Sequence, residues 1–427
     1  MKTVIGLEVH IELKTKSKMF CECTTDYFGK KPNTYTCPVC LGLPGALPIP
    51  NQKAINWCVM LGLALGCKIP LFSKFDRKNY FYPDLPKGYQ ISQYDQPFCI
   101  DGEIELSNGK KIGIRRVHME EDTGKLIHEE GSTLIDFNRS GVPLVEIVTE
   151  PDFDNAKDVR EYLQKLQQIA RYLEISDADM DKGQMRLEPN ISIKGSKKLY
   201  KVEVKNINSF SFVEKAINYE LKRQQEIIDN GETPIQETRG WDEKKQKTVS
   251  QRVKEEASDY RYFPEPDIPP IRWTQPQISK IKDQIKELPD EKFKRFIRQY
   301  QLNSYDSEIL TREKNLADYY EDAVKVGKTH EVSAKQIANY IINRKPDIEE
   351  VLPAQLIQKI IQSSTVTKID EGELDKTINE VIKNNEKAVS DYKNGKEQAI
   401  MFLVGQVLRK IPNLDANLVK EKISKSL

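Results

Sequence analysis

Four cysteines arranged as two close pairs are the clearest chemical signal in the sequence, with Cys21 and Cys23 in one pair and Cys37 and Cys40 in the other. Two thiolate pairs at such spacings are typical of a tetrahedral zinc site. Because four thiolates leave no coordination position open for water, the predicted zinc is structural and orders a knuckle over residues 21–40. The alternative is four ordinary thiols.

A second group of residues could bind a harder cation. Glu8, His10 and Glu12 alternate along a strand-like segment, so their side chains are expected on one face of a sheet. The run His118–Asp122 holds four ionisable groups at the end of another strand, and Glu146 stands alone among apolar neighbours. With the strands adjacent, these groups would form a carboxylate-rich pocket suited to Mg²⁺.

A purely structural explanation competes with this magnesium site. Glu8 and Glu12 could form an exposed strand face, and His118–Asp122 could be a solvated turn. For Glu12 taken alone, we favour the exposed strand face. Glu146 is harder to explain in this way, because burying a carboxylate among apolar residues is costly without a compensating cation or proton. For Glu146 the two explanations stay equally open.

Two stretches mix basic and aromatic residues, namely Lys74–Asp84 and Asp259–Phe263. Cations between aromatic rings suit phosphate charge and base stacking. The same composition also occurs in buried turns rich in tyrosine and phenylalanine. These stretches are therefore candidates for a phosphate or nucleotide contact.

The composition is that of a water-soluble globular protein, with 38% hydrophobic and 31% charged residues in 427. Lys and Arg (66) nearly cancel Asp and Glu (65), so a nucleic-acid surface would need local clustering of positive charge. The longest apolar run, Trp57–Cys67, is shorter than the ~18 residues of a membrane span and predicts a buried helix. We expect a cytoplasmic protein in which Cys58, Cys67 and Cys99 are packing residues.

The order of predicted elements indicates an α+β fold followed by helices. Alternating segments predict strands in a mixed or antiparallel sheet, and amphipathic spacing predicts two helices within the same region. The expected strands are 4–13, 103–106, 112–119, 144–148, 185–193 and 199–204, and the expected helices are 158–173 and 212–229. We predict three domains: a catalytic domain over 1–275, a helical domain over 276–362 and a helical tail over 363–427.

The proline-rich run Tyr262–Pro270 is the clearest predicted break in the chain. A polar cluster at residues 362–365 marks a softer one. The sequence contains no phosphate-binding loop, no dinucleotide-binding glycine motif and no nucleophile elbow. A nucleotide would therefore be held through Mg²⁺ and basic side chains.

Six blocks in a fixed order make the chain resemble one family, the B subunits of aspartyl/glutamyl-tRNA(Asn/Gln) amidotransferases. The resemblance extends over residues 4–270 and continues more weakly into the helical part. The blocks are Gly6–Leu13, Phe75–Asp84, His118–Asp122, Asn138–Val148, Lys205–Ser209 and Asp259–Asp267.

The resemblance implies a ligase reaction on misacylated Glu-tRNA(Gln) or Asp-tRNA(Asn). ATP phosphorylates the side-chain carboxylate, and ammonia then displaces the phosphate to leave an amide. The ammonia would come from glutamine through an amidase-type A subunit, with a small C subunit completing a heterotrimer. The implied fold of the catalytic domain resembles the glutamine synthetase and guanido kinase sheet.

Carried over residue by residue, the resemblance also implies site residues. Mg²⁺ maps onto Glu8, His10, Glu120 and Glu146, with Glu121 close by as a further catalytic residue. Lys78, together with Arg77, maps onto contacts with ATP phosphate or substrate. The zinc of the cysteine quartet is an accessory in such a family, present in some members and absent from others.

The tail departs from the family pattern. A segment that relatives carry between the stretches matching Leu356–Ile361 and Thr367–Glu373 is missing. From Lys393 to the end the chain holds seven basic and three acidic residues, an excess that suits contact with tRNA phosphates and equally suits a solvated helix. The resemblance leaves open which misacylated tRNA is used and how many Mg²⁺ ions bind.

Two rival functions compete with the ligase. One is a tRNA-binding assembly factor whose acidic face is only structural. The other is a zinc hydrolase, which requires an open coordination position that the four cysteines do not leave.

Overall fold

The structure is a computed structural model, and it describes residues 2–194, 200–253, 260–364, 371–393, 395–396, 398–411 and 416–427. The chain divides into two compact units, Met1–Lys292 and Phe293–Leu427.

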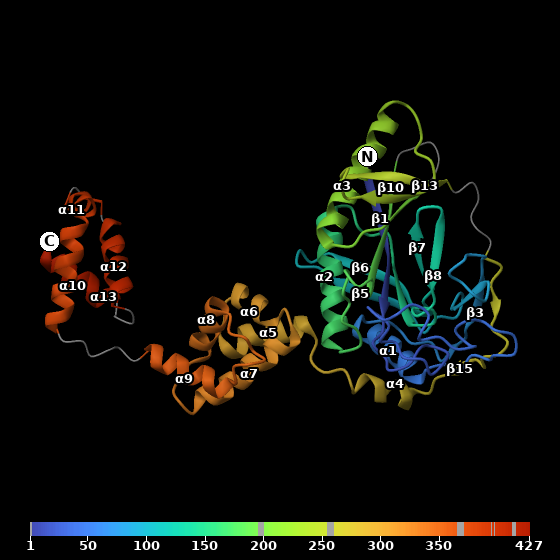
Figure 1. Cartoon of the computed structure of the whole chain (residues 1–427), viewed down its shortest axis with the longest axis horizontal. Coiled ribbons are helices and arrows are strands. Elements are labelled where there is room, and N and C mark those ends of the chain that lie inside the picture. The colour runs from blue at the N-terminus through green and yellow to red at the C-terminus, as the bar shows by residue number, and fades with distance from the viewer. Residues whose placement is uncertain are drawn as a thin grey trace. The chain divides into compact units, whose positions relative to one another are not determined.

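An eight-stranded sheet forms the centre of the first unit (Figure 1). Its strand order is β13-β12-β11-β10-β1-β9-β6-β5, and every neighbouring pair is antiparallel except β11 with β12. This confirms the predicted α+β fold with a mixed sheet. The strands are β1 (Lys2–Glu12), β5 (Cys99–Glu105), β6 (Lys111–Glu121), β9 (Pro143–Thr149), β10 (Met185–Lys194), β11 (Val202–Lys205), β12 (Glu237–Asp242) and β13 (Lys247–Val253).

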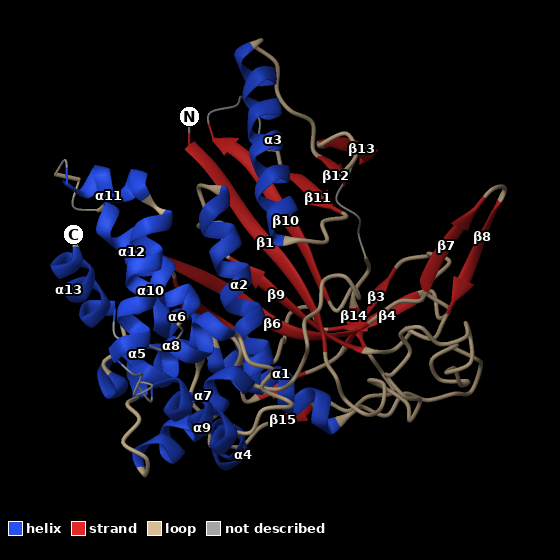
Figure 2. Cartoon of the chain, turned by 60° about the vertical axis from the view of Figure 1, so that its left-hand side comes forward, coloured by secondary structure: helices blue, strands red, loops and turns tan. Residues whose placement is uncertain are grey.

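One face of this sheet carries the hydrophobic core. Leu7, Val9 and Ile11 of β1 are 0–1% exposed, and they share one cluster with apolar side chains of α1 (Gln52–Ala64), α2 (Ala156–Tyr172) and α3 (Phe210–Asp229). Figure 2 shows α2 and α3 lying along the sheet. Because side chains alternate along a strand, burying this face leaves Glu8, His10 and Glu12 on the other face.

Small sheets of short strands complete the first unit. β3 (Asp76–Asn79) pairs with β4 (Tyr89–Ser92) and with β14 (Phe263–Pro264), while β2 (Phe72–Ser73) pairs with β15 (Ile271–Arg272) and β7 (Lys125–Glu129) with β8 (Ser132–Asp136). The proline-rich run thus brings the chain back onto β3 and does not end the domain. Asp259, the first residue of the basic and aromatic stretch Asp259–Phe263, lies outside the described residues.

The first unit extends further than the domain boundary expected at residue 275. Helix α4 (Gln275–Lys282) belongs to it, because Ile278 and Ile281 are buried in the core of the large sheet. Its N-terminus is stabilised by a capping box between Thr274 and Gln277.

The described part of the second unit is helical, as the sequence predicted, and has two hydrophobic clusters. One is formed within residues 296–360 and the other within residues 374–423. We expect the segment present in relatives to be missing between Ile361 and Thr367. Residues 365–370, which include part of this junction, lie outside the described residues. The remaining helices are α5 (Pro289–Tyr300), α6 (Ser304–Thr311), α7 (Lys314–Lys328), α8 (Ala334–Arg344), α9 (Pro353–Ser364), α10 (Glu371–Asn384), α11 (Glu386–Lys393), α12 (Ala399–Lys410) and α13 (Ala416–Ser426). Among the described helices, none combines the length and apolar character needed to cross a membrane.

Candidate active site

Strand register brings the predicted cation ligands together on the open face of the sheet. His10 of β1 and His118 of β6 both lie directly opposite Glu146 of β9. Directly opposed residues in antiparallel strands place their side chains on the same face and within contact distance. The Nε2 atom of His10 lies 3.5 Å from Glu146 and 3.8 Å from Glu120, and that of His118 lies 3.2 Å from Glu146 and 3.6 Å from Glu120.

Glu120 is held in place from the neighbouring small sheet. Gln90 Nε2 donates to one carboxylate oxygen at 3.1 Å, and Ser92 Oγ donates to the other at 2.7 Å. Lys78 Nζ, from β3, lies 3.7 Å from the same carboxylate. Glu120 itself is 2% exposed, so its orientation is determined by these three polar groups.

The charges of the site compensate one another. Burial opposes ionisation of Glu146 and Glu120, but His118 and His10 lower the pKa of Glu146 well below its usual value, and Lys78 is the main group that lowers the pKa of Glu120 to about 2. Burial also opposes the charged form of His10, yet hydrogen bonding and attraction from Glu146 raise its pKa to about 9. Without a cation, the site therefore holds two carboxylates balanced by imidazolium and ammonium groups.

The arrangement fits a hard divalent cation. His10, Glu120 and Glu146 each offer one ligand atom, and these atoms all lie within 4.8 Å of one another. A set of carboxylate oxygens with one imidazole nitrogen suits Mg²⁺ or Mn²⁺ better than a soft metal. His118 Nδ1 is buried and has no hydrogen-bond partner among the described residues.

Glu8 lies on the same sheet face but in an adjoining carboxylate group. It is directly opposite Glu188 and within ligand-sharing distance of Glu188 and Glu203, and Asn190 Nδ2 donates to it at 2.9 Å. Burial and the negative charge of Glu146 raise the pKa of Glu8. The four ligands predicted for one cation are thus divided between two neighbouring groups.

Two predicted site residues point away from the cation ligands. Glu121 follows Glu120 on β6, so its carboxylate faces the opposite side, where it accepts from Ile91 N at 2.9 Å and pairs with Lys87. Arg77 precedes Lys78 on β3 and forms a two-pronged ion pair with Glu265, at 2.7 and 2.8 Å. The alternation of side chains along each strand explains both placements.

The prediction that Glu12 lies on an exposed strand face is wrong, as is the solvated-turn alternative for His118–Asp122. Glu12 is 6% exposed and Asp122 is 2% exposed. Tyr27 Oη donates to both oxygens of Glu12 at 3.0 Å, while Arg186 pairs with Asp122 and lies 3.6 Å from Glu12. Burial and Asp122 raise the pKa of Glu12, whereas Arg139 and Arg186 outweigh burial and lower that of Asp122. The strand face beyond His10 is therefore a buried charge network.

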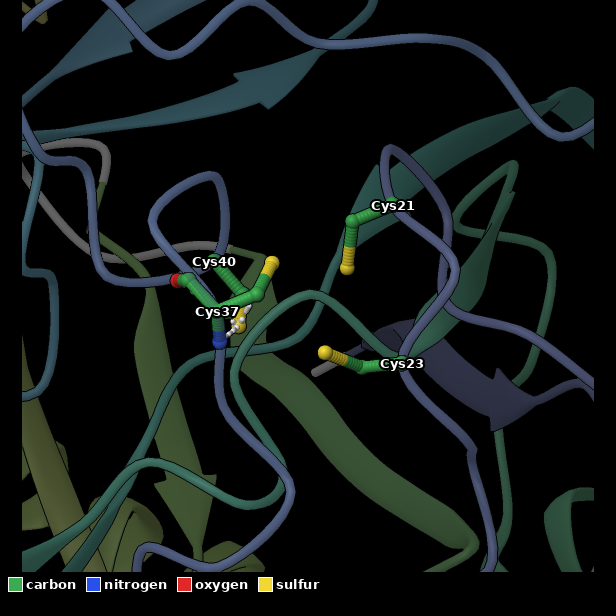
Figure 3. Close-up of side chains that lie close together, drawn as sticks. All are labelled: Cys21, Cys23, Cys37 and Cys40. Carbon is green, nitrogen blue, oxygen red and sulfur yellow. Dashed lines mark hydrogen bonds between the residues drawn. The ribbon is translucent and has the colours of Figure 1, made fainter.

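The four predicted zinc ligands converge, as Figure 3 shows. The sulfur atoms of Cys21, Cys23, Cys37 and Cys40 all lie within 4.8 Å of one another, and those of Cys37 and Cys40 are 3.8 Å apart. A tetrahedral ion with bonds of about 2.3 Å to sulfur separates neighbouring sulfurs by about 3.8 Å. Hydrogen bonding with Cys21 lowers the pKa of Cys40 to about 5, and the same bond raises the pKa of Cys21. The four thiols therefore do not all ionise readily, and the sulfur spacing is what indicates a metal site.

The cysteine loop is hydrogen-bonded to the segment that leads into β9. Asn138 accepts from Tyr35 N at 2.8 Å and donates to Lys31 O at 2.8 Å, and Ser140 donates to Cys40 O at 3.0 Å. Tyr27, which also lies in the cysteine loop, donates its hydroxyl hydrogen bond to Glu12 at the end of β1. The loop thus contacts both strands that supply cation ligands from the middle of the sheet.

Comparison with known proteins identifies the family of this chain. Residues 3–279 match the family model of the GatB/GatE catalytic domain, and residues 291–427 match that of the GatB domain. The chain is 47% identical over 476 aligned positions to the B subunit of the aspartyl/glutamyl-tRNA(Asn/Gln) amidotransferase from Thermodesulfovibrio yellowstonii, covering 100% of this chain and 99% of the relative. The chain belongs to the GatB family. Proteins of the same name from Caldanaerobacter subterraneus subsp. tengcongensis and Thermomicrobium roseum are 45% and 46% identical, covering 99% and 96% of this chain and 99% and 94% of the relatives.

For this member of the GatB family, sequence reasoning missed several residues that build the site. His118 was noted only as part of an acidic run, although it lies two residues before Glu120 and therefore shares its strand face. Gln90 and Ser92, which orient Glu120, carried no signal because their contacts arise only when β4 packs against β6. Glu188 and Glu203 alternate with apolar residues, a pattern equally typical of a solvated strand face.

Proposed function

We propose that the chain is the subunit of a carbon–nitrogen ligase that amidates misacylated tRNA. Its substrate would be Glu-tRNA(Gln), Asp-tRNA(Asn) or both, and its product the corresponding amide. The observation that carries the proposal is the convergence of His10, Glu120 and Glu146 from three strands beside Lys78, in a chain of the GatB family. Phosphoryl transfer depends mainly on such positioning and charge compensation.

The first step would join the side-chain carboxylate oxygen of the aminoacyl group to the γ-phosphorus of ATP, with ADP leaving. His10, Glu120 and Glu146 would hold Mg²⁺, which neutralises charge on the phosphates. Lys78 adds a positive charge at the same place, and Gln90 and Ser92 keep Glu120 oriented. Glu8 would serve the same chemistry from the adjoining group.

The second step would replace the phosphate by ammonia. Nitrogen attacks the acyl carbon, phosphate leaves, and a proton is lost to give the amide. Burial of Glu120, Glu146 and His118 supports this step, since an acyl phosphate hydrolyses unless water is kept away. Glu121 and Arg77 would support the site from the far sides of their strands, through Lys87 and Glu265.

Membership of the family supports a proposal for the partners. An amidase-type A subunit would release ammonia from glutamine, and a small C subunit would complete the heterotrimer. The excess of basic residues after Lys393 supports contact between the tail, residues 363–427, and tRNA phosphates. We place the protein in the cytoplasm, because tRNA is found there and because its reducing conditions keep the two close cysteine pairs available as metal ligands.

The cysteine loop would hold a structural zinc ion. The spacing of the four sulfur atoms supports this assignment. The fold of the first unit would be of the glutamine synthetase and guanido kinase type, supported by a largely antiparallel sheet whose open face carries the carboxylates.

The test is amidation by the chain co-expressed with candidate A and C subunits, with ammonium in place of glutamine. Each misacylated tRNA is assayed separately, and tRNA binding is measured in parallel. Glu146→Gln should abolish amidation and leave tRNA binding intact, whereas Glu150→Gln, an exposed carboxylate paired with Arg115, should behave as wild type. Full amidation by Glu146→Gln would refute the site assignment and favour a tRNA-binding assembly factor.

A further inference from the structure

Four tyrosines line one side of the candidate active site, and we call them the tyrosine wall: Tyr80, Tyr94, Tyr260 and Tyr262. Tyr260 makes edge contacts with Tyr80 at 5.8 Å and with Tyr262 at 6.0 Å between ring centroids. Tyr94 and Tyr262 are stacked, with centroids 4.3 Å apart and planes inclined by 11°. The wall joins residues that are far apart in the chain, because Asn79 N donates to Tyr260 O at 2.9 Å beside β3.

The wall is next to the carboxylates. Lys78 Nζ lies 3.7 Å from Glu120 and 5.2 Å from the ring centroid of Tyr260, so one ammonium group separates the cation site from the first ring. Arg116, two residues before His118 on the same face of β6, donates from Nη1 to Tyr94 O at 3.2 Å. Its Nε atom is buried and has no hydrogen-bond partner among the described residues.

The outer end of the wall is open to solvent. Tyr94 is 53% exposed although its ring is already stacked on Tyr262 on one side. Three further aromatic side chains, in residues 74–84 and 260–263, are exposed as well: Phe81 by 93%, Tyr82 by 57% and Phe263 by 44%. Exposed aromatic faces beside positive charge are the features on which proteins stack single-stranded bases.

We propose that the tyrosine wall is the subsite for the 3′-terminal base of the tRNA, with that base stacked on the open face of Tyr94. The inference rests on the proposed function and specifies where its substrate is held. The reacting carboxylate and the terminal ribose are joined only by an amino-acid side chain and one ester. When the carboxylate reaches the cation site, the terminal base must therefore lie close to that site, and the wall is the aromatic surface beside Lys78.

Charge favours the same occupant. The phosphate that precedes the terminal nucleotide must follow the base to the wall, where the positive charge of Arg116, which donates to Tyr94 O, attracts it. The adenine of ATP could also stack on an aromatic face, but a ribose and two further phosphates separate it from the transferred phosphate. That longer link places the base of ATP farther from Lys78 than the base of the aminoacyl nucleotide.

The experiment uses the chain in complex with its A and C subunits and a misacylated tRNA whose terminal adenine is replaced by fluorescent 2-aminopurine. Stacking should quench the probe on binding to wild type and to Tyr94→Phe, which keeps the ring. Tyr94→Leu keeps apolar bulk but removes the ring, so quenching should be lost. The KM for misacylated tRNA should then rise about ten-fold, with the KM for ATP unchanged.

Two outcomes would overturn the proposal. One is a probe that stays bright on wild-type complex that amidates normally, which would leave the proposed function intact. The other is a rise in the KM for ATP alone in Tyr94→Leu, which would assign the wall to the triphosphate nucleotide. Wild-type complex should also bind tRNA that lacks its terminal nucleotide more weakly, and this measurement does not depend on whether the Leu variant folds. Absence of amidation by wild type on every misacylated tRNA would instead refute the proposed function.

Discussion

Cation binding at His10 should depend steeply on pH. The pKa of His10 is raised to about 9, because hydrogen bonding and attraction from Glu146 outweigh burial. A metal can bind imidazole only after the proton has left, so binding must release that proton. At pH 7, two units below this pKa, the proton should weaken cation binding by about 100-fold relative to its value above pH 9.

The assay is Mn²⁺ binding, followed by electron paramagnetic resonance between pH 7 and 9. Mn²⁺ suits the carboxylate and imidazole ligands and is not drawn to the thiolates. The logarithm of the affinity should rise by about one unit per pH unit, and calorimetry in buffers of different ionisation enthalpy should detect the released proton.

The matched control is His10→Asn, which removes the titrating ring. Its Mn²⁺ affinity should be weaker and nearly independent of pH in this range. A wild-type affinity that stays constant from pH 7 to 9, or binding without proton release, would show that His10 is not held as an imidazolium by Glu146.

Three further predictions concern stability and the cysteine loop. In the absence of added divalent cation, protonated His10 should contribute about 3 kcal/mol to the free energy of unfolding, because its pKa is raised to about 9 in the folded protein. This contribution should be complete below pH 6.5 and should be lost as the pH rises through 9, as measured by urea unfolding. An unfolding free energy that does not change between pH 6.5 and 9 would contradict this prediction. Tyr27→Phe leaves buried Glu12 without its hydroxyl donor and should lower the free energy of unfolding by about 1–3 kcal/mol. The control Tyr305→Phe changes a side chain that is 68% exposed and should have no measurable effect. Equal unfolding free energies for the two variants would contradict this prediction. Cys23→Ser should purify with much less than one zinc per chain by atomic emission, and an unchanged zinc content would mean that the four cysteines do not form one site.

The strands that carry the site could be predicted because one face of each is apolar. In β1, Leu7, Val9 and Ile11 alternate with Glu8 and His10, which identified both the strand and the face that carries the ligands. The cysteine quartet was predictable from spacing alone, since its ligands come from one short loop. Local patterns therefore sufficed wherever the partners of a residue are close in sequence.

Contacts over long sequence separations account for what was missed. Glu12 was expected in solvent, but Tyr27 and Arg186, which bury it, lie 15 and 174 residues away. The proline-rich run was interpreted as a break, yet Phe263 pairs with Arg77 in a strand too short to show any alternation. Such pairings depend on tertiary packing, which composition and periodicity do not report.

The position of β1 in the sheet has a consequence for how this protein is made. Residues 2–12 leave the ribosome well before their neighbours β9 and β10, which end only at Thr149 and Lys194. Until Thr149 is made, both edges of β1 lack partners, and until Lys194 is made one edge still does. An unpaired strand with one apolar face invites aggregation and calls for chaperone protection. Nascent chains in which Lys194 is still inside the ribosome should therefore be captured by chaperones, and chains that expose all of β10 should escape.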